Sequence, residues 1–173
     1  MAHRKVHYDA AFEEYLRARG WPYVAVDEAK KALFAGVALK SFDFLVYSRS
    51  GPNLLVDVKG RKFPDSGGGR RGRNTRAWEN WVTQDDLDGL ADWQRVFGDG
   101  FVAMLVFAYW LQGPPARAPF EDVQYFRGRH YAFMAVPLAT YRQEARPRSA
   151  RWRTLAMPSA AFARCARDVA CFL

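Results

Sequence analysis

Hydrophobic residues recur at helical spacing in two segments of the first hundred residues. Residues 8–19 (YDAAFEEYLRAR) place apolar side chains at every third or fourth position, and Gly20 follows directly. The second segment begins at Thr83, a good N-cap residue, carries aspartates in its first turn and stops at Gly98. We predict one helix over 8–19 and a second between Thr83 and Gly98.

Between these helices, and after them, the apolar pattern is typical of strands. Residues 49–53 (RSGPN) have turn chemistry, so the strands on either side of them are expected to form a hairpin. The apolar run FVAMLVFAYWL is long enough for a central strand. We predict strands over residues 21–26, 41–48, 54–60 and 101–111.

The order of the elements predicts an α/β (α+β) fold, a mixed sheet flanked by helices. Residues 27–40 have no clear periodicity. The chain after the Pro-rich residues 112–122 is expected to form a hairpin over 123–136, a short helix over 138–145, a basic stretch over 146–154 and a final helix over 159–173. We predict a single domain, residues 1–173, with a core at about 8–110 and a C-terminal elaboration over 111–173.

The composition suits a protein that binds phosphate groups. The formal net charge is +8, and arginine greatly outnumbers lysine. Arginine binds phosphate in a forked geometry, although a GC-rich genome would also favour arginine codons. The N-terminus has no apolar signal core, and the chain has no run of about 18 apolar residues. We therefore expect a cytoplasmic protein without membrane contact.

A charged pair interrupts the apolar stretch NLLVDVKGRK, residues 53–62. Side chains alternate along a strand, so Asp57 and Lys59 share one face while Val56 and Val58 share the other. Charges are costly to bury without partners. The pair is either a surface ion pair on an edge strand, which would contribute little to stability, or part of a functional site.

A second acid favours the functional site. Asp43 precedes Asp57 by 14 residues across the predicted hairpin, and adjacent strands lie only about 4.8 Å apart. Two carboxylates this close repel each other, and Mg²⁺, which binds one or two carboxylates and several waters, relieves that repulsion. A lysine beside the ion can orient or deprotonate a water, or neutralise phosphate charge.

This order of elements, with Asp43 on one strand and Asp57-Val58-Lys59 on the next, resembles the PD-(D/E)XK nucleases over residues 8–110. That superfamily includes restriction endonucleases and Holliday-junction resolvases. The resemblance implies a DNA endonuclease that uses Mg²⁺, or alternatively Mn²⁺, and leaves a 5′-phosphate. It implies that Asp43 and Asp57 bind the metal beside Lys59, with Phe42 replacing the family's proline. Many relatives cut duplexes as homodimers, and residues beyond 111 are a candidate for that contact.

Many members of the superfamily add an acid from the first helix. Asp9 and Glu13 lie on one flank of the predicted apolar stripe, whereas Glu14 lies on the solvent side. Glu13, which has the longer side chain, is our prediction for the catalytic and metal-binding acid. Solvated helix charges are the alternative for all three.

In resolvase-like relatives, a Ser or Thr at the start of the second helix is followed three residues later by a Gln near the metal. Thr83 and Asp86 have this spacing, with Asp in place of Gln and Gln84 close by. Helix capping explains the same two residues without a catalytic role. Whether Asp9, Glu13 or Asp86 joins the site is left open by the sequence.

Basic residues follow the proposed site directly. A glycine-rich loop here could clamp a nucleic-acid backbone, or it could be a solvated loop. Trp78 and Trp81 are either core anchors or base-stacking residues. The predicted nucleic-acid-binding residues are Arg61, Lys62, Arg70, Arg71, Arg73 and Arg76.

A second basic cluster lies in the tail and includes residues 142–153. It could extend the same groove. Two other functions remain open: a catalytically inactive nucleic-acid-binding protein that retains the nuclease fold, and a small-molecule enzyme with an unrelated α/β fold.

Overall fold

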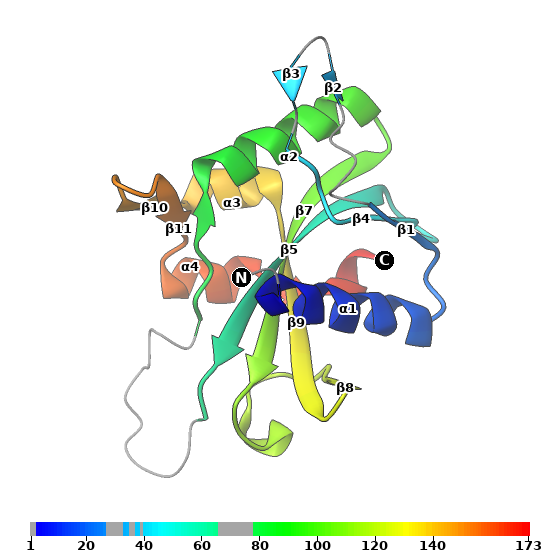
Figure 1. Cartoon of the computed structure of the whole chain (residues 1–173), viewed down its shortest axis with the longest axis vertical. Helices are drawn as coiled ribbons and strands as arrows, with labels where there is room; N and C mark the ends of the chain where they lie inside the picture. The colour runs from blue at the N-terminus through cyan, green and yellow to red at the C-terminus, as the bar shows by residue number, and fades with distance from the viewer. Residues whose placement is uncertain (1–2, 27–32, 35–36, 39, 66–77) are drawn as a thin grey trace.

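The computed structural model describes residues 3–26, 33–34, 37–38, 40–65 and 78–173. Its centre is a curled mixed sheet with the strand order β1-β4-β5-β7-β9-β12, in which β8 also pairs with β9 (Figure 1). The strands are β1 (Tyr23–Ala25), β4 (Phe44–Val46), β5 (Asn53–Phe63), β7 (Phe101–Leu111), β8 (Gln124–Phe126), β9 (Arg129–Pro137) and β12 (Arg167–Asp168).

Helices cover both faces of this sheet. Helix α1 (His3–Ala18) packs on one face with the even-numbered residues of β5, including Val56 and Val58. The other face packs against α2, α3 and α4 through Leu55 and Phe63. These helices span Gln84–Phe97, Leu138–Glu144 and Ser159–Cys165. The structure therefore has the α/β architecture predicted from the sequence.

Strand β5 lies in the interior of the sheet. It pairs antiparallel with β4 and parallel with β7, and the β5–β7 ladder extends over all 11 residues from Asn53↔Phe101 to Phe63↔Leu111. Helix α2 makes the crossover between these parallel strands. The predicted hairpin and central strand are thus confirmed, and β5 cannot be an edge strand.

Smaller elements surround the main sheet. Strands β6 (Val82–Thr83), β10 (Arg146–Ser149) and β11 (Thr154–Ala156) form a separate three-stranded sheet in the order β10-β11-β6. Strands β2 (Leu33–Phe34) and β3 (Val37–Ala38) pair with each other, and short 3-10 helices span Pro115–Arg117 (η1) and Val169–Phe172 (η2). None of the described helices is long and apolar enough to cross a membrane.

The C-terminal region corrects two predictions. The final helix ends at Cys165 instead of continuing to residue 173, because the chain then adds β12 to the edge of β9 through the pair Arg167↔Ala135. Pairing there satisfies backbone groups that β9 would otherwise expose at the sheet edge. The basic stretch 146–154, to which the sequence assigns no element, forms most of the β10–β11 hairpin.

Helix α1 crosses β5 at Gly60. A Cβ atom added to Gly60 would lie 2.1 Å from the Tyr8 ring, which no real structure tolerates without a shift. The absence of a side chain at Gly60 therefore allows the aromatic ring to cover the strand immediately after Asp57 and Lys59.

We expect Gly60→Ala to lower the free energy of unfolding by about 1–3 kcal/mol, because the new methyl group overpacks the α1–β5 contact. Urea denaturation measures this change. Gly51→Ala is the matched control: its added Cβ meets only the Ser48 hydroxyl, at 3.5 Å, and should change stability by less than about 0.5 kcal/mol. Equal effects of the two substitutions would contradict the assigned contact.

Candidate active site

Three aspartates are the buried charged residues of the described part of the chain. Asp43 is 6% exposed, Asp57 is 6% exposed and Asp86 is 7% exposed. They come from the position just before β4, the middle of β5 and the first turn of α2. Lys59, whose side chain is 13% exposed, lies among them.

The β4–β5 hairpin brings Asp43 and Asp57 together. Phe44 pairs with Val56, so the antiparallel register places Asp43, the residue before β4, opposite Asp57. The Asp43 Oδ2 atom accepts a hydrogen bond of 2.6 Å from the Val58 backbone N–H. This bond satisfies a β5 amide at the point where β4 begins, and it fixes the orientation of the carboxylate.

Asp57 and Lys59 form a buried ion pair. The Lys59 Nζ atom lies 3.0 Å from Asp57 Oδ1 and 2.8 Å from Asp57 Oδ2. Both side chains project from β5 towards the α2 face, as predicted from strand alternation. The alternative of a surface ion pair on an edge strand is wrong, since the pair is buried and β5 is an interior strand.

Asp86 combines two functions that the sequence presented as alternatives. It completes a capping box with Thr83, in which the Thr83 N–H donates to Asp86 Oδ2 at 3.0 Å and the Asp86 N–H donates to Thr83 Oγ1 at 3.1 Å. Its other oxygen, Oδ1, lies 3.1 Å from Lys59 Nζ and also accepts a hydrogen bond from Lys40 Nζ. The capping box thus aims one carboxylate oxygen at Lys59.

Lys40 is a site residue that the sequence reasoning missed. It lies just before β4, and its backbone carbonyl accepts a 2.8 Å hydrogen bond from Trp93 Nε1 of α2. Gly89 allows this close approach, because a Cβ there would lie 2.9 Å from Lys40 Cβ. The sequence signal for this contact was Gly89, a glycine in the middle of an amphipathic helix. A glycine does not reveal which distant residue packs against it, so Lys40 could not be identified.

Lys59 and Asp86 each stabilise the ionised form of the other. Burial alone would lower the pKa of Lys59, but the carboxylates of Asp57 and Asp86, with a further effect from Asp43, raise it above its ordinary value. Burial likewise opposes ionisation of Asp86, but Lys59, Lys40 and Thr83 hold its pKa well below the ordinary carboxyl range. Lys59 is therefore a stable ammonium, suited to neutralising a phosphate and poorly suited to removing a proton.

Comparison with known proteins identifies the fold. No protein-family model matches the chain, and no curated protein matches its sequence significantly. A solved structure that does match is Hjc of Archaeoglobus fulgidus, a Holliday junction resolvase from an archaeal hyperthermophile. The match covers 95% of this chain and 96% of that one, with a TM-score of 0.54 and 16% sequence identity. The chain therefore has a restriction-endonuclease-like fold, which it shares with this resolvase.

In this fold, the predicted acid Glu13 lies away from the three aspartates. Its carboxylate accepts hydrogen bonds from the Tyr23 hydroxyl at 2.8 Å and from Arg17 at 3.2 Å. Tyr23 belongs to β1, which is separated from β5 by β4. The flank of α1 that carries Glu13 thus contacts the far edge of the sheet.

Asp9 occupies the same flank of α1 one turn earlier, since residues four apart lie on the same helix face. It follows Tyr8, whose ring covers Gly60 immediately after the Asp57–Lys59 pair. Gly60 lies on the α1 face of β5, however, whereas Asp57 and Lys59 project from the α2 face, so this contact does not place Asp9 beside Asp57 or Lys59.

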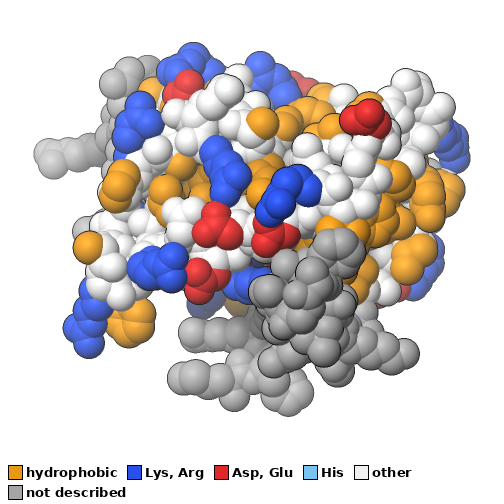
Figure 2. Space-filling model, turned by 90° about the horizontal axis from the view of Figure 1, so that it is seen from above, with side chains coloured by type: hydrophobic (Ala, Val, Ile, Leu, Met, Phe, Trp, Pro, Cys, Tyr) orange, Lys and Arg blue, Asp and Glu red, His pale blue; other side chains and the backbone are white. Residues whose placement is uncertain are grey.

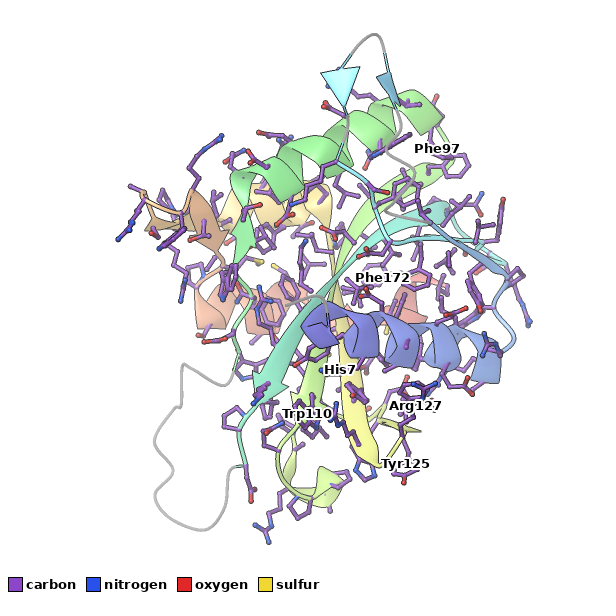
Figure 3. The ribbon with its side chains drawn as sticks, in the orientation of Figure 1. His7, Phe97, Trp110, Tyr125, Arg127 and Phe172 are labelled. Atoms are coloured by element: carbon purple, nitrogen blue, oxygen red, sulfur yellow. The ribbon has the colours of Figure 1, made fainter. Side chains whose placement is uncertain are left out.

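Of the predicted nucleic-acid-binding residues, the structure describes Arg61 and Lys62, which lie on opposite faces of β5. Arg61 donates 2.7 Å to the Gly60 carbonyl and stacks on the Trp81 ring at 4.1 Å, so much of its guanidinium is committed to the protein. Lys62 lies on the opposite face, 5.2 Å from the Trp110 ring, which is labelled in Figure 3. The loop residues Arg70, Arg71, Arg73 and Arg76 lie outside the described residues.

The oxygen ligands suit a hard cation. Asp43, Asp57 and Asp86 bring three carboxylates around the buried ammonium of Lys59, with Lys40 as a second, exposed ammonium at Asp86, and a divalent ion would offset the remaining negative charge. The described residues contain no group of three acidic, histidine or cysteine side chains placed to hold an ion together. Two carboxylates with waters are nevertheless sufficient for Mg²⁺, so Asp43 and Asp57 fit such an ion.

We expect Asp86→Asn to destabilise the protein by about 1–2 kcal/mol at neutral pH, because Lys59 loses a charged partner. The pKa of Asp86 is depressed in the folded state, so its stabilisation is present above the ordinary carboxyl value of 3.8 and is lost as the pH falls further. The difference between the wild type and Asp86→Asn should therefore shrink below about pH 4. Urea denaturation between pH 3 and 7 in EDTA measures it.

Asp85→Asn is the control for this experiment. Asp85 is the preceding residue, but its side chain is 67% exposed and pairs with Arg153 at the surface. Its substitution should cost less than about 0.5 kcal/mol. A difference that stays constant across this pH range, or an equal cost for Asp85→Asn, would contradict the assigned role of Asp86.

Proposed function

We propose that the protein is a metal-dependent endonuclease that hydrolyses DNA phosphodiester bonds, with Mg²⁺ or Mn²⁺ held by Asp43 and Asp57. The observation that supports this proposal best is the burial of three aspartates around Lys59 within a PD-(D/E)XK fold. A protein that needed only stability would gain little from such a cluster, since replacing buried ion pairs by apolar residues is often neutral or stabilising.

Each residue has a defined task in this proposal. Asp43 and Asp57 bind the cation, and the Val58 N–H holds Asp43 in position. The chemistry that Mg²⁺ supplies at such a site is polarisation of a phosphoryl oxygen and activation of water. Lys59, held as an ammonium, neutralises charge that develops on the phosphate. Asp86 is a positioning residue, because it acts through its ion pair with Lys59.

No acid of α1 is part of this proposal, because Glu13 bonds to Arg17 and Tyr23 and α1 packs on the face of β5 opposite Asp57 and Lys59. Homodimerisation and an intracellular location stay predictions from the sequence.

An inactive nucleic-acid-binding protein is the second candidate function. The ion pair between Lys59 and Asp57 favours it, since the ammonium already contacts both Asp57 carboxylate oxygens. A cation at Asp57 must compete with this contact. The two functions therefore differ in whether Mg²⁺ binds at all, which calorimetry can measure directly.

We expect Asp57→Asn and Lys59→Ala each to lower Mg²⁺-dependent cleavage of supercoiled plasmid by at least about 100-fold. Asp57→Asn should also abolish the calorimetric Mg²⁺ signal, whereas Lys59→Ala should retain it because Lys59 is not a ligand. Asp92→Asn, which removes an acid of α2 paired with Arg95, is the matched control and should cleave like the wild type. Cleavage that survives both site substitutions, or wild-type protein that neither binds Mg²⁺ nor cleaves, would refute the proposal.

Asp9→Asn and Glu13→Gln test whether an acid of α1 joins the site. We expect neither substitution to change Mg²⁺ binding, because α1 packs on the face of β5 opposite Asp57 and Lys59. Isothermal titration of both variants measures the effect, and thermal unfolding checks that each is folded. Weakened binding in Glu13→Gln alone would restore the sequence prediction.

A further inference from the structure

The β10–β11 hairpin, which is anchored to β6 at the start of α2, presents a tryptophan to solvent. Trp152 is 65% exposed, the largest exposure among the large hydrophobic side chains in the described ranges. It lies in the turn between Ser149 and Thr154, where its backbone N–H donates to Ser149 Oγ at 3.3 Å. A single exposed hydrophobic side chain is ordinary at a protein surface, so any partner of Trp152 must be inferred from the groups that adjoin it.

The hairpin is fixed to the elements that build the site. Strand β11 pairs with β6 through Thr154↔Thr83, and Thr83 is the N-cap residue that binds Asp86. The Arg153 carbonyl accepts a 2.8 Å hydrogen bond from the Gln84 N–H, at the first residue of α2. Asp86 in turn forms an ion pair with Lys59, so a chain of direct contacts connects the hairpin to the candidate active site. The turn that carries Trp152 is therefore anchored within three residues of Asp86.

Two arginines of the hairpin lie near tryptophan rings. The Arg151 guanidinium lies 5.1 Å from the Trp152 ring, and the Arg148 guanidinium lies 5.5 Å from the Trp81 ring. Both arginines are exposed, and no carboxylate of the described residues pairs with either.

The basic residues nearer α2 are different, because carboxylates neutralise them. Arg142 pairs with Asp88 and Arg153 pairs with Asp85. The face seen from above accordingly shows Lys and Arg side chains set among Asp and Glu (Figure 2). Arg148 and Arg151 are thus available to a polyanion, whereas Arg146 of the same hairpin donates to the backbone carbonyls of Gln143 and Ala145.

We infer that the β10–β11 hairpin binds unpaired bases of the nucleic-acid substrate, with Trp152 stacking on a base and Arg148 and Arg151 binding the adjoining phosphates. Aromatic stacking requires a base face, which a continuous duplex hides and a single-stranded arm or branch exposes. This inference rests on the proposed function and narrows its substrate to DNA that contains unpaired nucleotides next to the cleaved strand.

The test compares two labelled DNAs of equal length, one fully paired and one ending in a single-stranded arm, by fluorescence anisotropy in EDTA. We expect the wild type to prefer the DNA with the arm. Trp152→Ala should lower affinity for that DNA about tenfold and leave affinity for the duplex nearly unchanged. Trp152→Phe should restore most of the loss, and Arg151→Ala should weaken binding to both DNAs and reduce its salt dependence.

A second hairpin supplies the matched control. Tyr125 of β8 is 62% exposed and is labelled with Arg127 at the opposite end of the molecule from α2 (Figure 3). Tyr125→Ala removes a similarly exposed aromatic ring far from the site, and it should bind both DNAs like the wild type. An equal loss in Tyr125→Ala would contradict a specific role for Trp152.

The outcomes separate this inference from the proposed function. Wild-type protein that binds both DNAs, with Trp152→Ala indistinguishable from it, overturns the role of the hairpin and leaves the nuclease proposal intact. A change of oligomeric state in Trp152→Ala, measured by size-exclusion chromatography with unaltered DNA affinity, identifies the tryptophan as a protein interface and also overturns the inference. Wild-type protein that binds neither DNA contradicts the proposed function itself.

Discussion

The ammonium of Lys59 interacts with three carboxylates, which come from the β4–β5 hairpin and from the start of α2. It lies 2.8 Å from Asp57 on its own strand and 3.1 Å from Asp86 on α2, and Asp43 of the neighbouring strand adds to the negative potential around it. Without this cation, three carboxylates would share a poorly hydrated space, where their mutual repulsion is weakly screened. The Lys59 charge thus stabilises the placement of three elements: β5, the β4–β5 hairpin and the N-terminus of α2.

The fold provides the geometry that this interaction needs. The long β5–β7 ladder fixes the middle of β5, the β4–β5 register brings Asp43 opposite Asp57, and the capping box aims Asp86 at Lys59. Local backbone rules make each of these placements, and none requires an unusual conformation. A cation or a phosphate that enters the site then meets groups that are already oriented, which is the condition for electrostatic catalysis.

Sequence patterns predicted the parts of this arrangement that depend on local rules. Alternation placed Asp57 and Lys59 on one face, turn residues predicted the hairpin to Asp43, and the Thr83 cap marked the start of α2. Contacts between distant segments could not be predicted in this way. Such contacts depend on how helices and strands pack. Examples are the approach of Lys40 to Gly89, the hydrogen bond between Glu13 and Tyr23, and the pairing of β11 with β6. The last helix was predicted too long because helical periodicity does not reveal the free edge of β9, to which residues 167–168 bind.

A crystal structure of the protein soaked in Mn²⁺, with an anomalous difference map, tests the central claim most directly. The account predicts a strong anomalous peak between the carboxylates of Asp43 and Asp57, with Lys59 displaced from Asp57 and still paired with Asp86. A map with no peak there, in which Lys59 remains bound to both oxygens of Asp57, would contradict a metal-dependent nuclease. In that case, the buried charges would serve only the stability of the fold.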